Sequence, residues 1–78
     1  MKPVKELQEK ISQIWSMVLK SQIVGAQDNF FDLGGDSLKL LRVHAELETY
    51  LGSKLSVIDL FQYPTVETLA EHIHRQNA

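Results

Sequence analysis

Apolar residues recur every three or four positions in the first part of the chain, with charged and amide side chains between them. This spacing places the apolar residues on one stripe of a helix and leaves Lys5 and Glu6 on another face. The pattern predicts a helix from Pro3 to Lys20, with Pro3 in the first turn, where its missing N–H removes no hydrogen bond. We expect Trp15 in the core, with its indole N–H near the surface. The predicted stripe consists of Val4, Leu7, Ile11, Ile14, Trp15, Val18 and Leu19.

A second amphipathic segment predicts a helix from Ser37 to Leu51. Gly52 is expected to end it, because glycine readily adopts the left-handed conformation that follows many helices. The stripe of this helix consists of Leu40, Val43, His44, Leu47 and Leu51, and Leu41 widens it. We expect His44 to be a core or boundary residue whose polar atoms are satisfied.

Two shorter helices are predicted after Gly52. Ser56 is expected to cap a helix from Val57 to Gln62, with Asp59 completing an acidic variant of the capping box. Thr65 is expected to cap a last helix that ends near Arg75. The inward residues of the last helix are Val66, Leu69, Ala70 and Ile73.

The connection from Ser21 to Asp36 is irregular, because glycine, asparagine and aspartate interrupt any helical pattern. It nevertheless contains several apolar residues, so we expect it to pack onto the core. Phe30, Phe31 and Leu33 are predicted to hold it down, and Asp28 is predicted to cap a local turn. The fold class is therefore all-α: a small four-helix bundle of three long helices and one short third helix, with a long first loop.

Composition narrows the function classes. The 78 residues, 44% of them hydrophobic, suffice for one small core and a single domain over residues 1–78. The absence of cysteine excludes disulfides and thiolate metal sites. The net charge is -2, from 8 basic and 10 acidic residues that are interspersed, so the charge pattern does not favour nucleic-acid binding. No apolar run approaches membrane-spanning length, so we expect a cytoplasmic protein, or a domain of one, without a membrane partner.

The last helix carries two histidines, but they do not predict a metal site. His72 and His74 are two residues apart and therefore do not share a helix face. We predict no metal ligands and no catalytic residues in this chain.

Ser37 is the residue with the most distinctive surroundings. It follows Gly34, Gly35 and Asp36 and begins a predicted helix, where unpaired backbone N–H groups and the helix dipole favour an anion such as phosphate. Leu38 falls outside the main stripe, which predicts an exposed leucine beside the hydroxyl. Taken on its own, Ser37 is better explained as the N-cap of the helix. Asp36 is the favoured cap, and its alternative role is a contact with a partner enzyme.

The run from Asp28 to Leu38, D-N-F-F-D-L-G-G-D-S-L, resembles the phosphopantetheine attachment motif of carrier domains in modular peptide and polyketide synthases. The resemblance extends over nearly the whole chain, including the passage from Phe61 to Val66. It implies an acyl-carrier-protein-like bundle in which a phosphopantetheinyl transferase, using magnesium, attaches 4'-phosphopantetheine from coenzyme A to Ser37. Gly35, Asp36 and Leu38 surround that attachment site. The arm would carry acyl, aminoacyl or peptidyl groups as thioesters.

The resemblance also implies surfaces for partner enzymes, namely the transferase and the adenylation, condensation, thioesterase or ketosynthase domains of a synthase. Lys39 and Arg42 lie three residues apart on the helix of Ser37, where they form either a recognition surface or a solvated face. Leu38, Ile58 and Tyr63 are candidates for the apolar part of a docking face, and each is equally a candidate for the core. We expect a monomeric domain.

Other classes remain as alternatives. Gly35-Asp36-Ser37-Leu38 matches the signature of a serine esterase family, but such enzymes need an α/β scaffold and an Asp/His pair that 78 helical residues do not supply. A helical interaction module without modification is the second alternative. Within the carrier class, a peptidyl carrier is favoured and a polyketide acyl carrier stays open.

Overall fold

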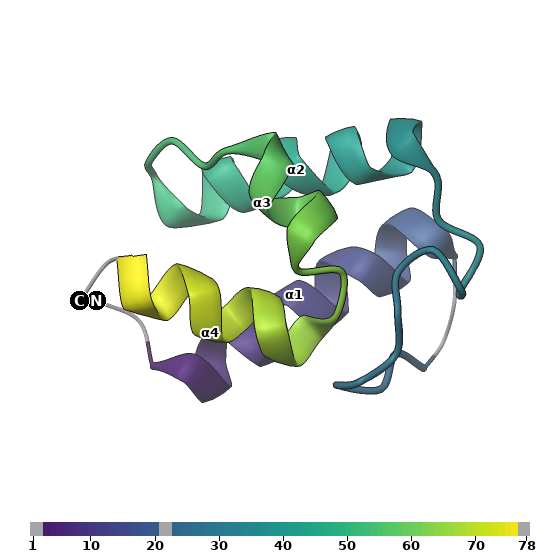
Figure 1. Cartoon of the computed structure of the whole chain (residues 1–78), viewed down its shortest axis with the longest axis horizontal. Coiled ribbons are helices and arrows are strands. Elements are labelled where there is room, and N and C mark those ends of the chain that lie inside the picture. Colours follow the sequence, from purple (N-terminus) through teal and green to yellow (C-terminus); the bar gives the residue numbers. More distant parts are fainter. Residues whose placement is uncertain (1–2, 21–22, 77–78) are drawn as a thin grey trace.

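The computed structural model describes residues 3–20 and 23–76 and confirms the all-helical prediction (Figure 1). The helices are α1 (Val4–Leu19), α2 (Ser37–Leu51), α3 (Val57–Gln62) and α4 (Val66–Gln76). The predicted bounds of α2 and α3 are confirmed, those of α1 differ by one residue at each end, and that of α4 differs by one residue at its C-terminal end. Ser21, the predicted start of the first connection, lies outside the described residues. Within the described ranges, no helix is both long enough and apolar enough to cross a membrane.

The ends of the helices follow local backbone chemistry. Pro3 is the N-cap of α1 in an extended conformation, so the prediction that it lies within the first turn was wrong by one position. Gly52 ends α2 with a φ of 68°, as predicted. Ser56 stands at the N-cap of α3, but its side chain makes no capping bond, so the predicted capping box is not formed. Thr65 does cap α4, since its Oγ1 accepts a hydrogen bond from the Thr68 N–H at 3.2 Å.

The core lies where α1 packs against both α2 and α4, while α3 contacts α2. Each large apolar side chain buried there contributes roughly 1.5–3 kcal/mol relative to an exposed position. Two expectations were wrong. Leu41 is 49% exposed and does not widen the buried stripe, and the Trp15 indole N–H is buried without a hydrogen-bond partner. The buried residues are Leu7, Ile11, Ile14, Trp15, Val18, Phe30, Leu40, Val43, Leu47, Leu55, Leu60, Val66, Leu69, Ala70 and Ile73.

The long connection between α1 and α2 is fixed by backbone contacts with the connection between α3 and α4. The Phe30 N–H donates to the Pro64 carbonyl at 2.7 Å, and the Glu67 N–H donates to the Ala26 carbonyl at 2.9 Å. An isolated antiparallel bridge joins Asn29 to Thr65 beside them. These contacts tie the segment before Ser37 to the start of α4.

A local turn begins that connection. The Asp28 carboxylate accepts a hydrogen bond from the Gly25 N–H at 2.9 Å, which confirms the predicted capping role of Asp28. The Asp28 N–H in turn donates to the Gly25 carbonyl at 3.1 Å. The chain therefore enters the segment before Ser37 from a closed turn.

Candidate functional site

Ser37 is the first residue of α2, and its side chain is exposed. The residue before it caps the helix: Asp36 has extended backbone angles, and its Oδ1 accepts a hydrogen bond from the Lys39 N–H at 2.8 Å. The capping role favoured for Asp36 is therefore confirmed, and the alternative that Ser37 is itself the cap was wrong. The Ser37 hydroxyl is left available at the positive end of the helix dipole.

The two glycines before Asp36 serve different purposes. Gly34 has a φ of 95°, which side-chain-bearing residues rarely adopt, and there is open space around the position of its absent Cβ. Gly35 lies against Phe30, where an added Cβ would stand 2.3 Å from a ring carbon. Its N–H also donates to the Phe30 carbonyl at 3.1 Å. Gly35 therefore allows the loop before Ser37 to close directly over a buried ring.

The adjacent phenylalanines point to different environments. Phe30 is fully buried and meets Trp15 edge-to-face, with 5.0 Å between ring centroids. Phe31 is 38% exposed, and its ring stacks on Phe61 of α3 at a centroid distance of 6.0 Å. Leu33 is half-buried. The prediction that these residues hold the loop down is confirmed for Phe30, which does so in the core, and for Phe31, which does so by packing on Phe30 and on α3.

Exposed apolar residues flank Ser37 on α2 and occur again on α3. Leu38 is 74% exposed, as predicted, and Ile58 is 61% exposed, which removes the core alternative for both. Leu41 and Phe61 are also exposed, at 49% and 44%, and the sequence pattern did not assign them to a surface. The signal for Leu41 was its place beside the main stripe of α2, although periodicity could not decide to which side it belonged.

Tyr63 does not belong to this exposed set. It is half-buried, packs against the core and stacks on His72 at a centroid distance of 4.2 Å. The prediction that Tyr63 belongs to an apolar docking face is therefore corrected in favour of its core alternative, because its ring packs on a residue of α4. Short-range sequence spacing did not reveal this contact because its partner is nine positions away on another helix.

The two basic residues near Ser37 differ in their surroundings. Lys39 is half-buried, and its Nζ donates to the Gly34 carbonyl at 3.2 Å, which folds the side chain back over the loop before Ser37. Arg42 is exposed on the next turn of α2. Of the two, Arg42 presents the freer charge to another molecule.

The histidines are engaged away from Ser37. His44 contacts the Leu55 carbonyl and the Glu48 carboxylate, which confirms the prediction of a satisfied boundary residue. His72 lies beside Asp59 and Tyr63. In residues 3–20 and 23–76, no group of three histidine, cysteine or carboxylate side chains is arranged to hold a metal ion.

Known proteins resemble the chain in sequence over most of its length. Residues 9–73 match the family model described as "Phosphopantetheine attachment site". The chain is 47% identical over 68 residues to Tyrocidine synthase 2 of Brevibacillus parabrevis, a match that covers 87% of this chain and 2% of that protein. It is 42% identical over 71 residues to Gramicidin S synthase 1 of Brevibacillus brevis, which covers 91% of this chain and 6% of that protein. The chain thus spans only a small part of these curated relatives.

Solved structures show the same fold. BlmI, a type-II acyl-carrier-protein from Streptomyces verticillus involved in bleomycin biosynthesis, superposes with a TM-score of 0.92 at 27% identity over 96% of this chain and 90% of that one. A peptidyl carrier protein, solved in complex with the phosphopantetheine transferase Sfp and coenzyme A, gives a TM-score of 0.83 at 33% identity. That match covers 88% of this chain and 90% of the other.

Proposed function

The chain belongs to the family of phosphopantetheine attachment sites, and from this premise we propose that Ser37 is the residue that carries the 4'-phosphopantetheine arm. The observation that carries the proposal is the exposed hydroxyl of Ser37 at the first position of α2, directly after the capping residue Asp36. Once attached, the arm supplies a terminal thiol that holds acyl, aminoacyl or peptidyl groups as thioesters.

The residues around Ser37 suit a phosphodiester. The N-terminus of α2 directs unpaired backbone N–H groups and the positive end of its dipole toward a phosphate on this hydroxyl. In the transfer, the Ser37 oxygen forms a bond to the phosphorus next to pantetheine, and the phosphoanhydride bond of coenzyme A breaks. The adenosine bisphosphate leaves, and the hydroxyl proton passes to the transferase. Gly35 and Phe30 hold the loop so that the serine stays accessible.

We assign this domain no catalytic step of its own. An esterase function for Gly35-Asp36-Ser37-Leu38 needs a histidine base within hydrogen-bond reach of Ser37. His44 and His72 contact other groups, namely Leu55, Glu48, Asp59 and Tyr63. Under this proposal the domain is a substrate of the transferase and a carrier between active sites.

Partner enzymes are assigned to the surface beside Ser37. Leu38 and Ile58 supply exposed apolar area, and Arg42 supplies a charge, while Lys39 contributes in part because its ammonium group contacts the loop. The partners would be the transferase and the adenylation, condensation, thioesterase or ketosynthase domains of a synthase. A peptidyl carrier in nonribosomal peptide synthesis is favoured because one matching structure is a peptidyl carrier protein. A polyketide acyl carrier is the second candidate, since the chain is 42% identical over 71 residues to the PKS-NRPS hybrid synthetase acdB of Aspergillus candidus, a match that covers 91% of this chain and 3% of that protein.

Three accompanying expectations belong to the same proposal. Residues 1–78 are treated as one carrier domain, because residues 9–73 match one family model. A monomeric state and a cytoplasmic location stay predictions.

The proposal is tested by intact mass spectrometry after incubation with coenzyme A, magnesium and a broad-specificity phosphopantetheinyl transferase. We expect the wild-type chain to gain the mass of one phosphopantetheine arm and the Ser37→Ala variant to gain none. Since Asp36 and not Ser37 caps α2, the free energy of unfolding of Ser37→Ala should lie within about 0.5 kcal/mol of the wild-type value. An unmodified wild-type chain beside a loaded control carrier would contradict the proposal, as would modification of Ser37→Ala.

A further inference from the structure

The short helix α3 has too few buried side chains to fix its own orientation. Its residues Val57–Gln62 include a single buried side chain, that of Leu60, whereas Ile58 is exposed and Phe61 is partly exposed and stacks on Phe31. One buried side chain anchors a helix at a point but leaves rotation and tilt about that point weakly determined. Other contacts must therefore hold α3 in place.

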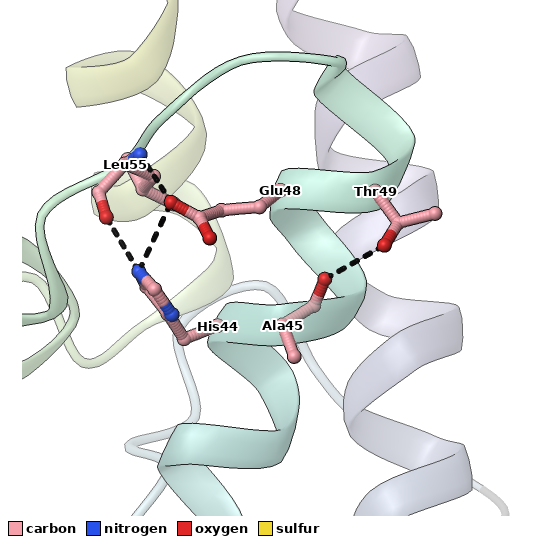
Figure 2. Close-up of polar contacts among 5 residues, drawn as sticks. All are labelled: His44, Ala45, Glu48, Thr49 and Leu55. Atoms are coloured by element: carbon pink, nitrogen blue, oxygen red, sulfur yellow. Dashed lines mark hydrogen bonds and ion pairs between the residues drawn. The ribbon is translucent and has the colours of Figure 1, made fainter.

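A polar clamp from α2 holds Leu55, which lies two residues before the start of α3 (Figure 2). His44 Nε2 lies 2.5 Å from the Leu55 carbonyl oxygen, and the Leu55 N–H donates to Glu48 Oε2 at 2.8 Å. The same Glu48 oxygen lies 3.5 Å from His44 Nε2. Both backbone polar groups of Leu55 are thus satisfied by side chains one turn apart on α2. Since Leu55 is buried, leaving either group unpaired would be unfavourable.

A second contact holds α3 from the side of α4. His72 Nε2 lies 3.0 Å from Asp59 Oδ2, with both side chains largely buried. The contact has the distance of an ion pair without the alignment of a hydrogen bond. The His72 ring also stacks on Tyr63, the residue that ends α3. The segment that leads into α3, the middle of α3 and its C-cap are therefore each tied to a side chain of α2 or α4.

We propose that His44 with Glu48, and His72 with Asp59, are positioning residues that set the orientation of α3 relative to α2. This inference rests on the proposed function, in which Leu38 on α2 and Ile58 on α3 belong to one docking surface. A surface divided between two helices binds well only if their relative position is fixed beforehand, because ordering it during binding weakens the affinity. The clamps act through α3 and do not touch Ser37.

The direct structural test uses His44→Val and Asp59→Ala in isotope-labelled protein. Valine cannot donate to the Leu55 carbonyl, and alanine cannot pair with His72. Residual dipolar couplings of the α3 amides should report a changed or averaged orientation of α3 relative to α2 in both variants. Amide exchange at Leu55 should become faster by about tenfold in Glu48→Ala, which removes the acceptor of that N–H.

Two matched variants separate the clamp from general effects of mutation on α2. Thr49→Ala removes an exposed hydrogen bond to the Ala45 carbonyl within the same helix and leaves Leu55 untouched (Figure 2). His44→Gln keeps an N–H donor at a similar reach. Thr49→Ala should retain the wild-type dipolar couplings of α3. The couplings of His44→Gln should lie closer to the wild-type values than those of His44→Val.

The functional readout is the rate of Ser37 loading by the transferase. We expect His44→Val and Asp59→Ala to raise the KM for the carrier by about fivefold, with kcat nearly unchanged, because recognition weakens and the serine does not move. His44→Gln should recover most of the difference. The inference would be overturned, with wild type still loaded, if the KM values of both His44→Val and Asp59→Ala lay within twofold of the KM of Thr49→Ala. Unchanged dipolar couplings of α3 in these variants would overturn it as well. Loss of loading in wild type would instead overturn the proposed function.

Discussion

Gly35 lies directly against the ring of Phe30, so closely that a Cβ at position 35 would stand 2.3 Å from one ring carbon and 2.7 Å from the Phe30 carbonyl oxygen. The contact brings the loop before Ser37 onto the most buried aromatic residue before α2. Ser37 is two residues further along the chain. The position of the serine therefore depends on a close contact between a glycine and a buried ring.

Replacing Gly35 by alanine should destabilise the domain by about 2 kcal/mol, because either the buried ring or the loop backbone has to move. Urea unfolding followed by circular dichroism measures this. Gly34→Ala is the matched control, with an expected loss of about 1 kcal/mol from backbone strain at its φ of 95°.

A double-mutant cycle with Phe30→Leu separates the two causes. The penalty at position 35 should shrink in the leucine background, and the penalty at position 34 should not. Equal penalties for Gly35→Ala in both backgrounds would show that the ring is not what excludes a side chain there.

Replacing Asp36 by alanine should lower the free energy of unfolding by about 1 kcal/mol, because the Lys39 N–H loses its acceptor. Asp36→Asn keeps an acceptor oxygen, so its free energy of unfolding should be close to the wild-type value. The same two variants also test whether the carboxylate contacts the transferase. If Asp36→Asn is loaded at the wild-type rate, Asp36 acts only as the cap of α2. A slower loading rate at unchanged stability would show that its carboxylate also contacts the transferase.

The neighbouring phenylalanines should respond very differently to alanine. Phe30→Ala removes a fully buried ring, with a loss of about 3–5 kcal/mol, which approaches the whole stability expected of a small domain. Phe31→Ala removes a partly exposed ring stacked on Phe61, with a loss of about 1 kcal/mol. Far-ultraviolet circular dichroism during thermal unfolding should show little folded Phe30→Ala at room temperature and a cooperative transition for Phe31→Ala. Similar losses at both positions would contradict the separation of their roles.

Leu38→Ala and Ile58→Ala should change stability by less than about 0.5 kcal/mol, because both side chains are mostly exposed. If they belong to the docking surface, each should raise the KM for the carrier by about fivefold in transferase kinetics. Met17→Ala is the matched control, since Met17 is a 56% exposed apolar residue on α1, outside the proposed surface. A KM change for Met17→Ala as large as those for Leu38→Ala and Ile58→Ala would remove the assignment of a specific face.

Local features of the sequence predicted the helices well. The bounds of α2 and α3 follow from Gly52, Ser56 and the apolar spacing, all of which act within a few residues. The capping role of Asp36 follows from its place before the first helical residue. The same locality gave a wrong prediction at Ser56, where the correct residue type stands at the cap but makes no side-chain bond.

The sequence by itself determined the helical elements, the position of Ser37 at a helix start and the motif around it, because these depend on neighbours along the chain. Only the tertiary structure decided that Phe30 is buried and Phe31 is not, that Leu41 faces solvent, and that Tyr63 stacks on His72. It also decided that α2 and α4 hold α3 through His44 and His72. These outcomes depend on which residues from distant segments meet. Periodicity defines the faces of a helix, but the packing of the other helices decides which face is covered.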